Sequence, residues 1–206
     1  MKRAMKKSQS LDILAAIGAG IFAGAAIFEI IPDTASQLGW LVALLLSAAG
    51  FVIWYVLKLL TNKFSKNAFA ITASLAIWFH SALEGAVTAV GLRLGGVIGI
   101  GIVVGMILHL LPEFFAVVAI LKSEGFSLNK SVMIDVVTII VLLISFGVVY
   151  MFLPNLGKQG LVILESISAG AFLYIAGHSL LKRLRLATIL AVAAGMAIML
   201  LLRVVI

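Results

Sequence analysis

Long apolar runs separated by short polar links dominate this chain. Seven of the runs reach the roughly 20 residues that an α-helix needs to cross about 30 Å of hydrocarbon. They place helices at about 11–31, 38–60, 68–92, 94–121, 132–153, 160–181 and 186–206. The pattern predicts an all-α integral membrane protein, a polytopic bundle of seven transmembrane helices that forms a single domain over residues 1–206.

Composition supports this interpretation and narrows the chemistry. The 206 residues are 64% hydrophobic and 11% charged, with a mean hydropathy of +1.26. A soluble domain of this length would need far more polar surface. The chain has no cysteine, so a metal site would have to use nitrogen and oxygen ligands. The formal charge of +7 comes from basic residues in short links rather than from one exposed face, so we expect no nucleic-acid binding.

The basic residues also predict an orientation in the membrane. If residues 1–10 form a basic cytoplasmic N-terminus, only Arg93, Lys158 and Arg203 of the 15 Lys and Arg residues fall on the outer side. Such a bias sets the orientation of proteins with short loops. The first apolar run is longer than the 7–15 residues of a signal-peptide core, so we expect it to be retained as a helix. We therefore expect a multi-pass protein of the cell membrane, with its C-terminus outside.

Two histidine–glutamate pairs with the same spacing lie on the third and fourth predicted helices. His80 precedes Glu84 by four residues, and His109 precedes Glu113 by four residues. Residues four apart share one face of a helix, so each pair presents an imidazole and a carboxylate to the same space. An ionisable residue at the centre of a membrane helix costs about 2.5–3.5 kcal/mol. A divalent cation bound by all four side chains would compensate this cost.

A simpler alternative is that each histidine bonds only the glutamate on its own helix. Against it, the short link near Leu92 makes the two helices antiparallel neighbours, which places both histidines at a similar depth. The sequence therefore favours a shared metal site formed by His80, Glu84, His109 and Glu113.

Four further ionisable residues lie along a candidate entry and exit path. Glu29 and Asp33 fall at the expected outer end of the first helix, as a carboxylate mouth or simply a solvated helix end. Glu165 lies near the outer end of the sixth span, and His178 near its cytoplasmic end. Asp135, near the inner start of the fifth span, is interpreted as a polar residue at the membrane interface.

The paired motifs resemble the transport site of the ZIP family of divalent-metal transporters. In that family, one helix carries a His-Asn-x-x-(Asp/Glu)-Gly pattern and the next carries His-(acid)-x-Pro-(His/Glu). Segments 80–85 and 109–113 match these patterns, and segments 27–33 and 168–174 resemble the family's second and seventh helices. The resemblance covers nearly the whole chain.

The departures from the family pattern refine what the resemblance implies. Ser81 replaces the usual Asn, and Leu110 stands where an acid supports a second metal, which implies a mononuclear site. Seven spans instead of eight imply a variant that lacks the family's first helix. The short link 61–67 lacks the family's His-rich loop, so we expect no metal sensing there. The resemblance alone also allows a homodimer.

We therefore expect a transporter, not an enzyme, that carries a divalent metal ion into the cytoplasm, with this ion and membrane lipid as its partners. The nitrogen and oxygen donors favour Zn2+ as substrate, with Cd2+, Fe2+ and Mn2+ as further candidates. Two alternatives stay open. An intramembrane metal-dependent hydrolase would need a spare carboxylate close to the four ligands, and the sequence indicates none. A metal-independent proton pathway would use the same side chains as a relay.

Overall fold

A computed structural model describes residues 2–153, 157–182 and 184–205, and the regular secondary structure in these ranges is helical. The elements are α1 (Lys2–Gly24), the π-helix η1 (Ala25–Ile30), α2 (Ile31–Leu38), α3 (Trp40–Thr61), α4 (Ala68–Leu92), α5 (Gly96–Ser123), α6 (Leu128–Phe152), α7 (Lys158–Leu181) and α8 (Leu186–Val205). Together they provide seven helices that are long and apolar enough to cross a membrane. This confirms the all-helical class and fits a multi-pass membrane protein, whereas the side on which each end lies stays a prediction.

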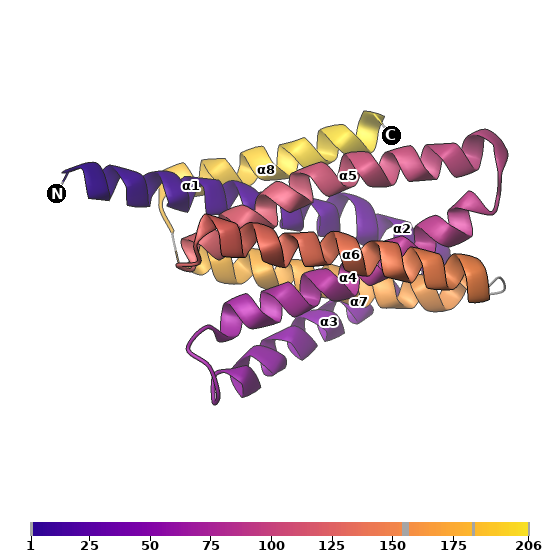
Figure 1. The fold of residues 1–206 in the computed structure, drawn as a ribbon, viewed down its shortest axis with the longest axis horizontal. Helices are drawn as coiled ribbons and strands as arrows, with labels where there is room; N and C mark the ends of the chain where they lie inside the picture. Colours follow the sequence, from indigo (N-terminus) through magenta and orange to yellow (C-terminus); the bar gives the residue numbers. More distant parts are fainter. Residues whose placement is uncertain (1, 154–156, 183, 206) are drawn as a thin grey trace.

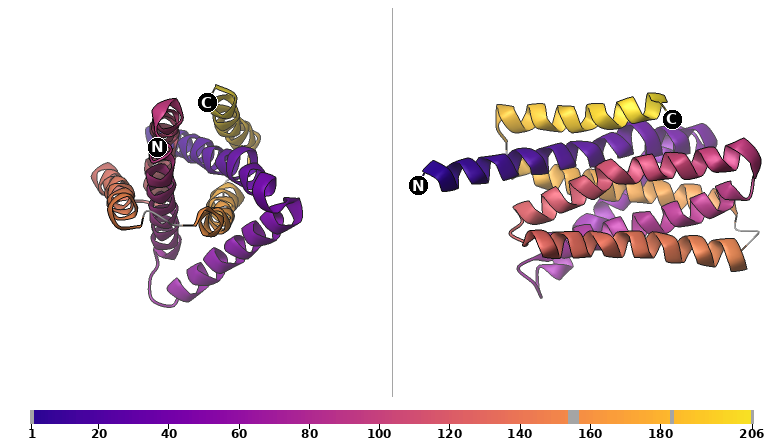
Figure 2. Two further views of the ribbon diagram at one scale, coloured as in Figure 1. Left: turned by 90° about the vertical axis from the view of Figure 1, so that its right-hand side faces the viewer. Right: turned by 45° about the horizontal axis from the view of Figure 1, so that its top comes forward.

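The helices lie side by side in one elongated bundle. Helix α1 begins at one end of the bundle and α8 ends towards the other (Figures 1 and 2). Helices α4 and α5 are joined by residues 93–95, pack against each other and run in opposite directions (Figure 1). The two helices with the histidine–glutamate pairs are therefore antiparallel neighbours, as predicted.

Helices α1, α4 and α7 form the interior, whereas α3, α5, α6 and α8 expose most of their central residues. The outward faces are rich in leucine, isoleucine and valine. Such faces suit hydrocarbon, because the helix satisfies its own backbone hydrogen bonds and leaves only apolar side chains for lipid. Polar chemistry is thereby confined to the interior.

Glycines let several helix pairs approach closely. A Cβ atom added to Gly20 on α1 would lie 2.1 Å from the carbonyl oxygen of Val192 on α8. A Cβ atom added to Gly85 on α4 would lie 2.2 Å from the carbonyl oxygen of Leu142 on α6. Helix association in lipid depends on such close packing, because no hydrophobic drive acts between helices there. Helix α4, which carries His80 and Glu84, is thus packed directly on α6.

The first span differs from the prediction at its C-terminal end. We expected it to end near residue 31, but the helical chain continues through η1 and α2 to Leu38. Pro32 has no N–H group to bond the carbonyl four residues earlier, and the wider turns of η1 lie immediately before it. Glu29 and Asp33 therefore belong to the helix instead of closing it, and Glu29 lies on a π-helical turn, a feature frequent at functional sites.

Candidate metal centre

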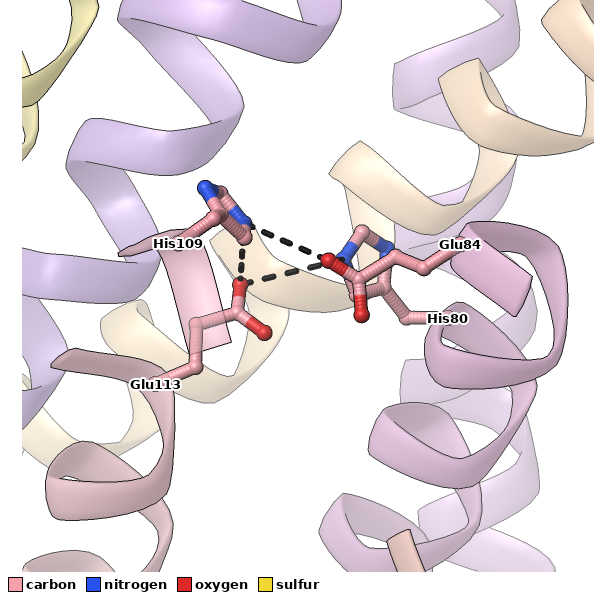
Figure 3. Close-up of side chains that lie close together, drawn as sticks. All are labelled: His80, Glu84, His109 and Glu113. Carbon is pink, nitrogen blue, oxygen red and sulfur yellow. Dashed lines mark hydrogen bonds and ion pairs between the residues drawn. The ribbon is translucent and has the colours of Figure 1, made fainter. Parts of the chain in front are cut away.

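Two side chains from α4 and two from α5 point into a common space (Figure 3). His80 and Glu84 lie one turn apart on α4, and His109 and Glu113 lie one turn apart on α5. Each of the four offers one nitrogen or oxygen atom, and these atoms all lie within 4.8 Å of one another. The structure thus brings the four predicted ligands together.

The facing atoms are the Nε2 atoms of both imidazoles and the Oε1 atoms of both carboxylates. His80 Nε2 lies 3.5 Å from Glu84 Oε1 and 3.7 Å from Glu113 Oε1. His109 Nε2 lies 3.6 Å from Glu84 Oε1 and 3.0 Å from Glu113 Oε1. Two donors about 2.0–2.1 Å from a tetrahedral zinc ion are about 3.4 Å apart. The four spacings are close to this value, so small side-chain shifts would suffice to enclose one ion.

These distances argue against the alternative that each histidine bonds only the glutamate on its own helix. Each histidine lies within 3.7 Å of a carboxylate on the other helix as well as of the one on its own helix. Of the two pairs that share a helix, His109 and Glu113 form a hydrogen bond of 3.0 Å, whereas His80 and Glu84 lie 3.5 Å apart. The four groups therefore form one cluster across the α4–α5 interface.

The cluster is buried and incompletely satisfied. His80, His109 and Glu113 are buried, and Glu84 is nearly so. Within the described residues, His80 Nε2 and Glu84 Oε2 have no hydrogen-bond partner. Leaving such an atom unpaired costs about 1–3 kcal/mol, and more for a charged group. A bound cation would satisfy both imidazoles and both carboxylates at once.

The second nitrogen of each imidazole also faces an oxygen atom. His80 Nδ1 lies 2.9 Å from Ser168 Oγ on α7. His109 Nδ1 lies 3.1 Å from Glu29 Oε2 on η1. Sequence reasoning missed both contacts. The only available signals were the unusual position of a glutamate inside an apolar span and the likeness of segment 168–174 to a family helix.

A cavity of about 670 Å³ joins the cluster to one end of the bundle. Its walls come from η1, α2, α4, α5, α7 and α8. The charged and imidazole side chains among them are Glu29, Asp33, His80, Glu84, His109, Glu165 and Arg203. Carboxylates thus outnumber the single guanidinium in this lining, which makes the cavity attractive to cations.

Of the four residues predicted along the entry and exit path, three line the cavity and one lies outside it. Glu29, Asp33 and Glu165 line the cavity, and Asp33 forms an ion pair with Arg203, which sequence reasoning had counted only as an outer loop charge. His178 lies outside this cavity and stacks on Phe69 with ring centroids 3.9 Å apart. Its role as an exit ligand stays a prediction.

Asp135 is buried inside the bundle, which the sequence did not indicate, and its position near the membrane interface stays a prediction. Asp135 is 1% exposed, and its helix, α6, packs against α4 and α5. Periodicity could not reveal this, because the position of a residue near a helix end does not tell which neighbours cover it.

Apolar side chains close the opposite side of the cluster. The ring of Phe172 lies 4.3 Å from the ring of His80, and the ring of Phe22 lies 4.7 Å from that of Phe172, between ring centroids. Both phenylalanines are fully buried, and Val117, one turn beyond Glu113 on α5, is 1% exposed. The cavity therefore reaches the cluster from one end, and a layer of buried apolar side chains lies on its other side.

The arrangement offers two imidazole nitrogens and two carboxylate oxygens, a donor set that suits Zn2+ and related divalent ions. No protein-family model matches the chain, and no curated protein matches it either.

Proposed function

We propose that this protein transports a divalent metal ion, with Zn2+ as the best candidate, through a mononuclear site formed by His80, Glu84, His109 and Glu113. The observation that supports this most directly is the set of four donor atoms 3.0–3.7 Å from their neighbours, contributed by two adjacent membrane-spanning helices. Ionisable residues at such positions are rare because they are costly, and they mark ion pathways. The resemblance of the two motifs to the ZIP family points to the same function.

The cavity and the apolar layer suggest how the ion moves. An ion enters from the open end, where Glu29, Asp33 and Glu165 raise the local cation concentration. It then exchanges its water ligands for the four protein donors. Release requires a rearrangement that parts the layer around Phe172 and lets water reach the site from the other end. With the orientation predicted from the basic residues, this direction is into the cytoplasm.

Protons would compete with the metal at this site. Imidazole and carboxylate bind a metal only when they are deprotonated, so binding of the ion releases protons and weakens as the pH falls. Protonation of the emptied site would also help to prevent the ion from rebinding. Transport is therefore expected to slow on acidification of the side from which the metal enters.

Uptake of Zn2+ into proteoliposomes containing a fluorescent zinc indicator tests the proposal. The wild-type protein should take up Zn2+, and His109→Ala and Glu113→Ala should abolish most of the uptake. Glu124→Ala is a matched control, because Glu124 follows the end of α5 and pairs with Lys182 outside the cluster. Uptake that survives both cluster substitutions, or that is lost equally in Glu124→Ala, would contradict the proposal.

The hydrolase alternative needs a carboxylate beside the metal to activate water. Contrary to the expectation from the sequence, such a group is near, since Glu29 lies 3.1 Å from His109. However, Glu29 contacts Nδ1, the nitrogen that does not face the other donors. This position suits orientation of the ring better than activation of water.

The proton-pathway alternative predicts flux without metal. Liposomes loaded with a pH-sensitive dye and treated with a chelator distinguish it from metal transport. The transporter proposal predicts no proton flux above that of empty liposomes under these conditions. Metal-free flux that is lost in Glu84→Gln would favour the proton pathway.

A further inference from the structure

Each imidazole of the cluster is held at its Nδ1 atom by an oxygen from a helix other than α4 and α5. We propose that Ser168 and Glu29 are positioning residues that keep both histidines in the tautomer with the proton on Nδ1, so that both Nε2 lone pairs face the metal. This inference rests on the proposed function. It adds α7 and η1 to a site whose ligands come from α4 and α5.

The two nitrogens of an imidazole ring play different roles at a metal site. A neutral ring has one N–H donor and one lone pair, and the proton can reside on either nitrogen. In the cluster, the Nε2 atoms of His80 and His109 face the carboxylates of Glu84 and Glu113. A metal bound there needs both Nε2 lone pairs. Both protons must then reside on Nδ1, where a buried N–H requires an acceptor.

Ser168 supplies the acceptor for His80. Its Oγ lies 2.9 Å from Nδ1, and the residue is fully buried. Phe172, one turn further along α7, packs against the His80 ring with centroids 4.3 Å apart. Helix α7 thus holds the edge of the ring with a hydroxyl and packs a phenyl ring against it. This leaves the ring little freedom to turn Nε2 away from Glu84 and Glu113.

Glu29 supplies the acceptor for His109. Its Oε2 lies 3.1 Å from Nδ1, and an ionised carboxylate can only accept hydrogen bonds. Carboxylate–histidine–metal arrangements of this kind fix the tautomer and increase the basicity of the ligating nitrogen. The side chain of Glu29 is 33% exposed, on the wall of the cavity. It therefore reaches His109 from the side by which the ion enters.

A direct metal ligand is the competing role for Glu29. In that case its carboxylate would face the same space as the four clustered atoms. Its contact is instead with the nitrogen on the other side of the His109 ring. Among the described residues, the cluster of mutually close donors contains only His80, Glu84, His109 and Glu113. The geometry points to orientation of His109.

The test uses the full chain in detergent or lipid, labelled with 15N-histidine and loaded with 113Cd2+ as a probe. We expect cadmium–nitrogen coupling at Nε2 of His80 and His109, with the proton on Nδ1 of both rings. Coupling through Nδ1 of either ring would overturn the inference and leave the transport proposal standing. A bound cadmium ion without coupling to either histidine would overturn the metal site itself, and the positioning roles with it.

Variants test the two residues separately. Glu29→Ala and Ser168→Ala should each weaken Cd2+ binding by about 10–100-fold, as is typical when the partner of a ligating histidine is lost. Glu29→Gln keeps an acceptor oxygen, so it should restore most of the affinity lost in Glu29→Ala. If Glu29→Gln binds as weakly as Glu29→Ala, the positioning role is refuted in favour of a charged ligand. Unchanged affinity and coupling in Ser168→Ala would refute the role of Ser168.

Discussion

Substitution of Gly85 by alanine tests how the packing of α4 supports the site. The new Cβ atom would lie 2.2 Å from the Leu142 carbonyl oxygen and 3.0 Å from the Phe146 amide nitrogen. A carbon and a carbonyl oxygen normally stay about 3.3 Å apart, so α4 and α6 must separate locally by about 1 Å. Overpacking of this kind costs about 1–3 kcal/mol. Because Gly85 follows Glu84, the displacement also disturbs a cluster whose four nitrogen–oxygen distances are 3.0–3.7 Å.

Gly147→Ala on α6 is the matched control, because a Cβ atom at Gly147 would meet nothing within 4 Å. Both variants gain the same helix propensity, about 1 kcal/mol for alanine over glycine, so their difference isolates the clash. For a chain of this size, a decrease of about 1–3 kcal/mol in the free energy of unfolding lowers the Tm by about 2–12 °C. Thermal unfolding in detergent and Cd2+ affinity measure the two effects. If Gly85→Ala matches Gly147→Ala in both Tm and affinity, the close α4–α6 contact is refuted.

Two further predictions concern the cavity and the orientation. Arg203→Gln removes the guanidinium from the cavity lining and should lower the KM for Zn2+ uptake, by a factor that shrinks as ionic strength rises. Lys158→Gln removes the same charge outside this lining and should leave KM unchanged; equal effects in the two variants would argue against electrostatic attraction in the cavity. Because the chain has no cysteine, Lys66→Cys and Leu94→Cys each introduce a single exposed thiol. An impermeant maleimide added to intact cells should label only Leu94→Cys, and the opposite result would invert the proposed orientation.

The helical class and the approximate spans could be predicted because they depend on local properties. In hydrocarbon, each backbone polar group must be satisfied within its own segment, so a long apolar run can only be a helix. Local spacing also explains why the sequence correctly paired His80 with Glu84 and His109 with Glu113. Four-residue spacing places each pair on one face, and a short link places α4 and α5 side by side.

Other parts of the site depend on contacts between distant segments. Ser168 meets His80 across 88 positions of sequence, and the path of the first span through η1 places Glu29 against His109. The rotation of a membrane helix about its axis is set by close packing with its neighbours, and an apolar pattern contains little information about it. For the same reason, the burial of Asp135 was not anticipated.

By itself, the sequence determined the membrane-spanning helices and the two paired motifs, because hydropathy and helical periodicity act over a single segment. Only the tertiary structure decided that the two pairs form one cluster, that a cavity reaches it from one end, and that Phe172 packs against His80 on the other side. These features arise where α1, α4, α5, α7 and α8 meet. Their geometry follows from interhelical packing, which no single helix specifies.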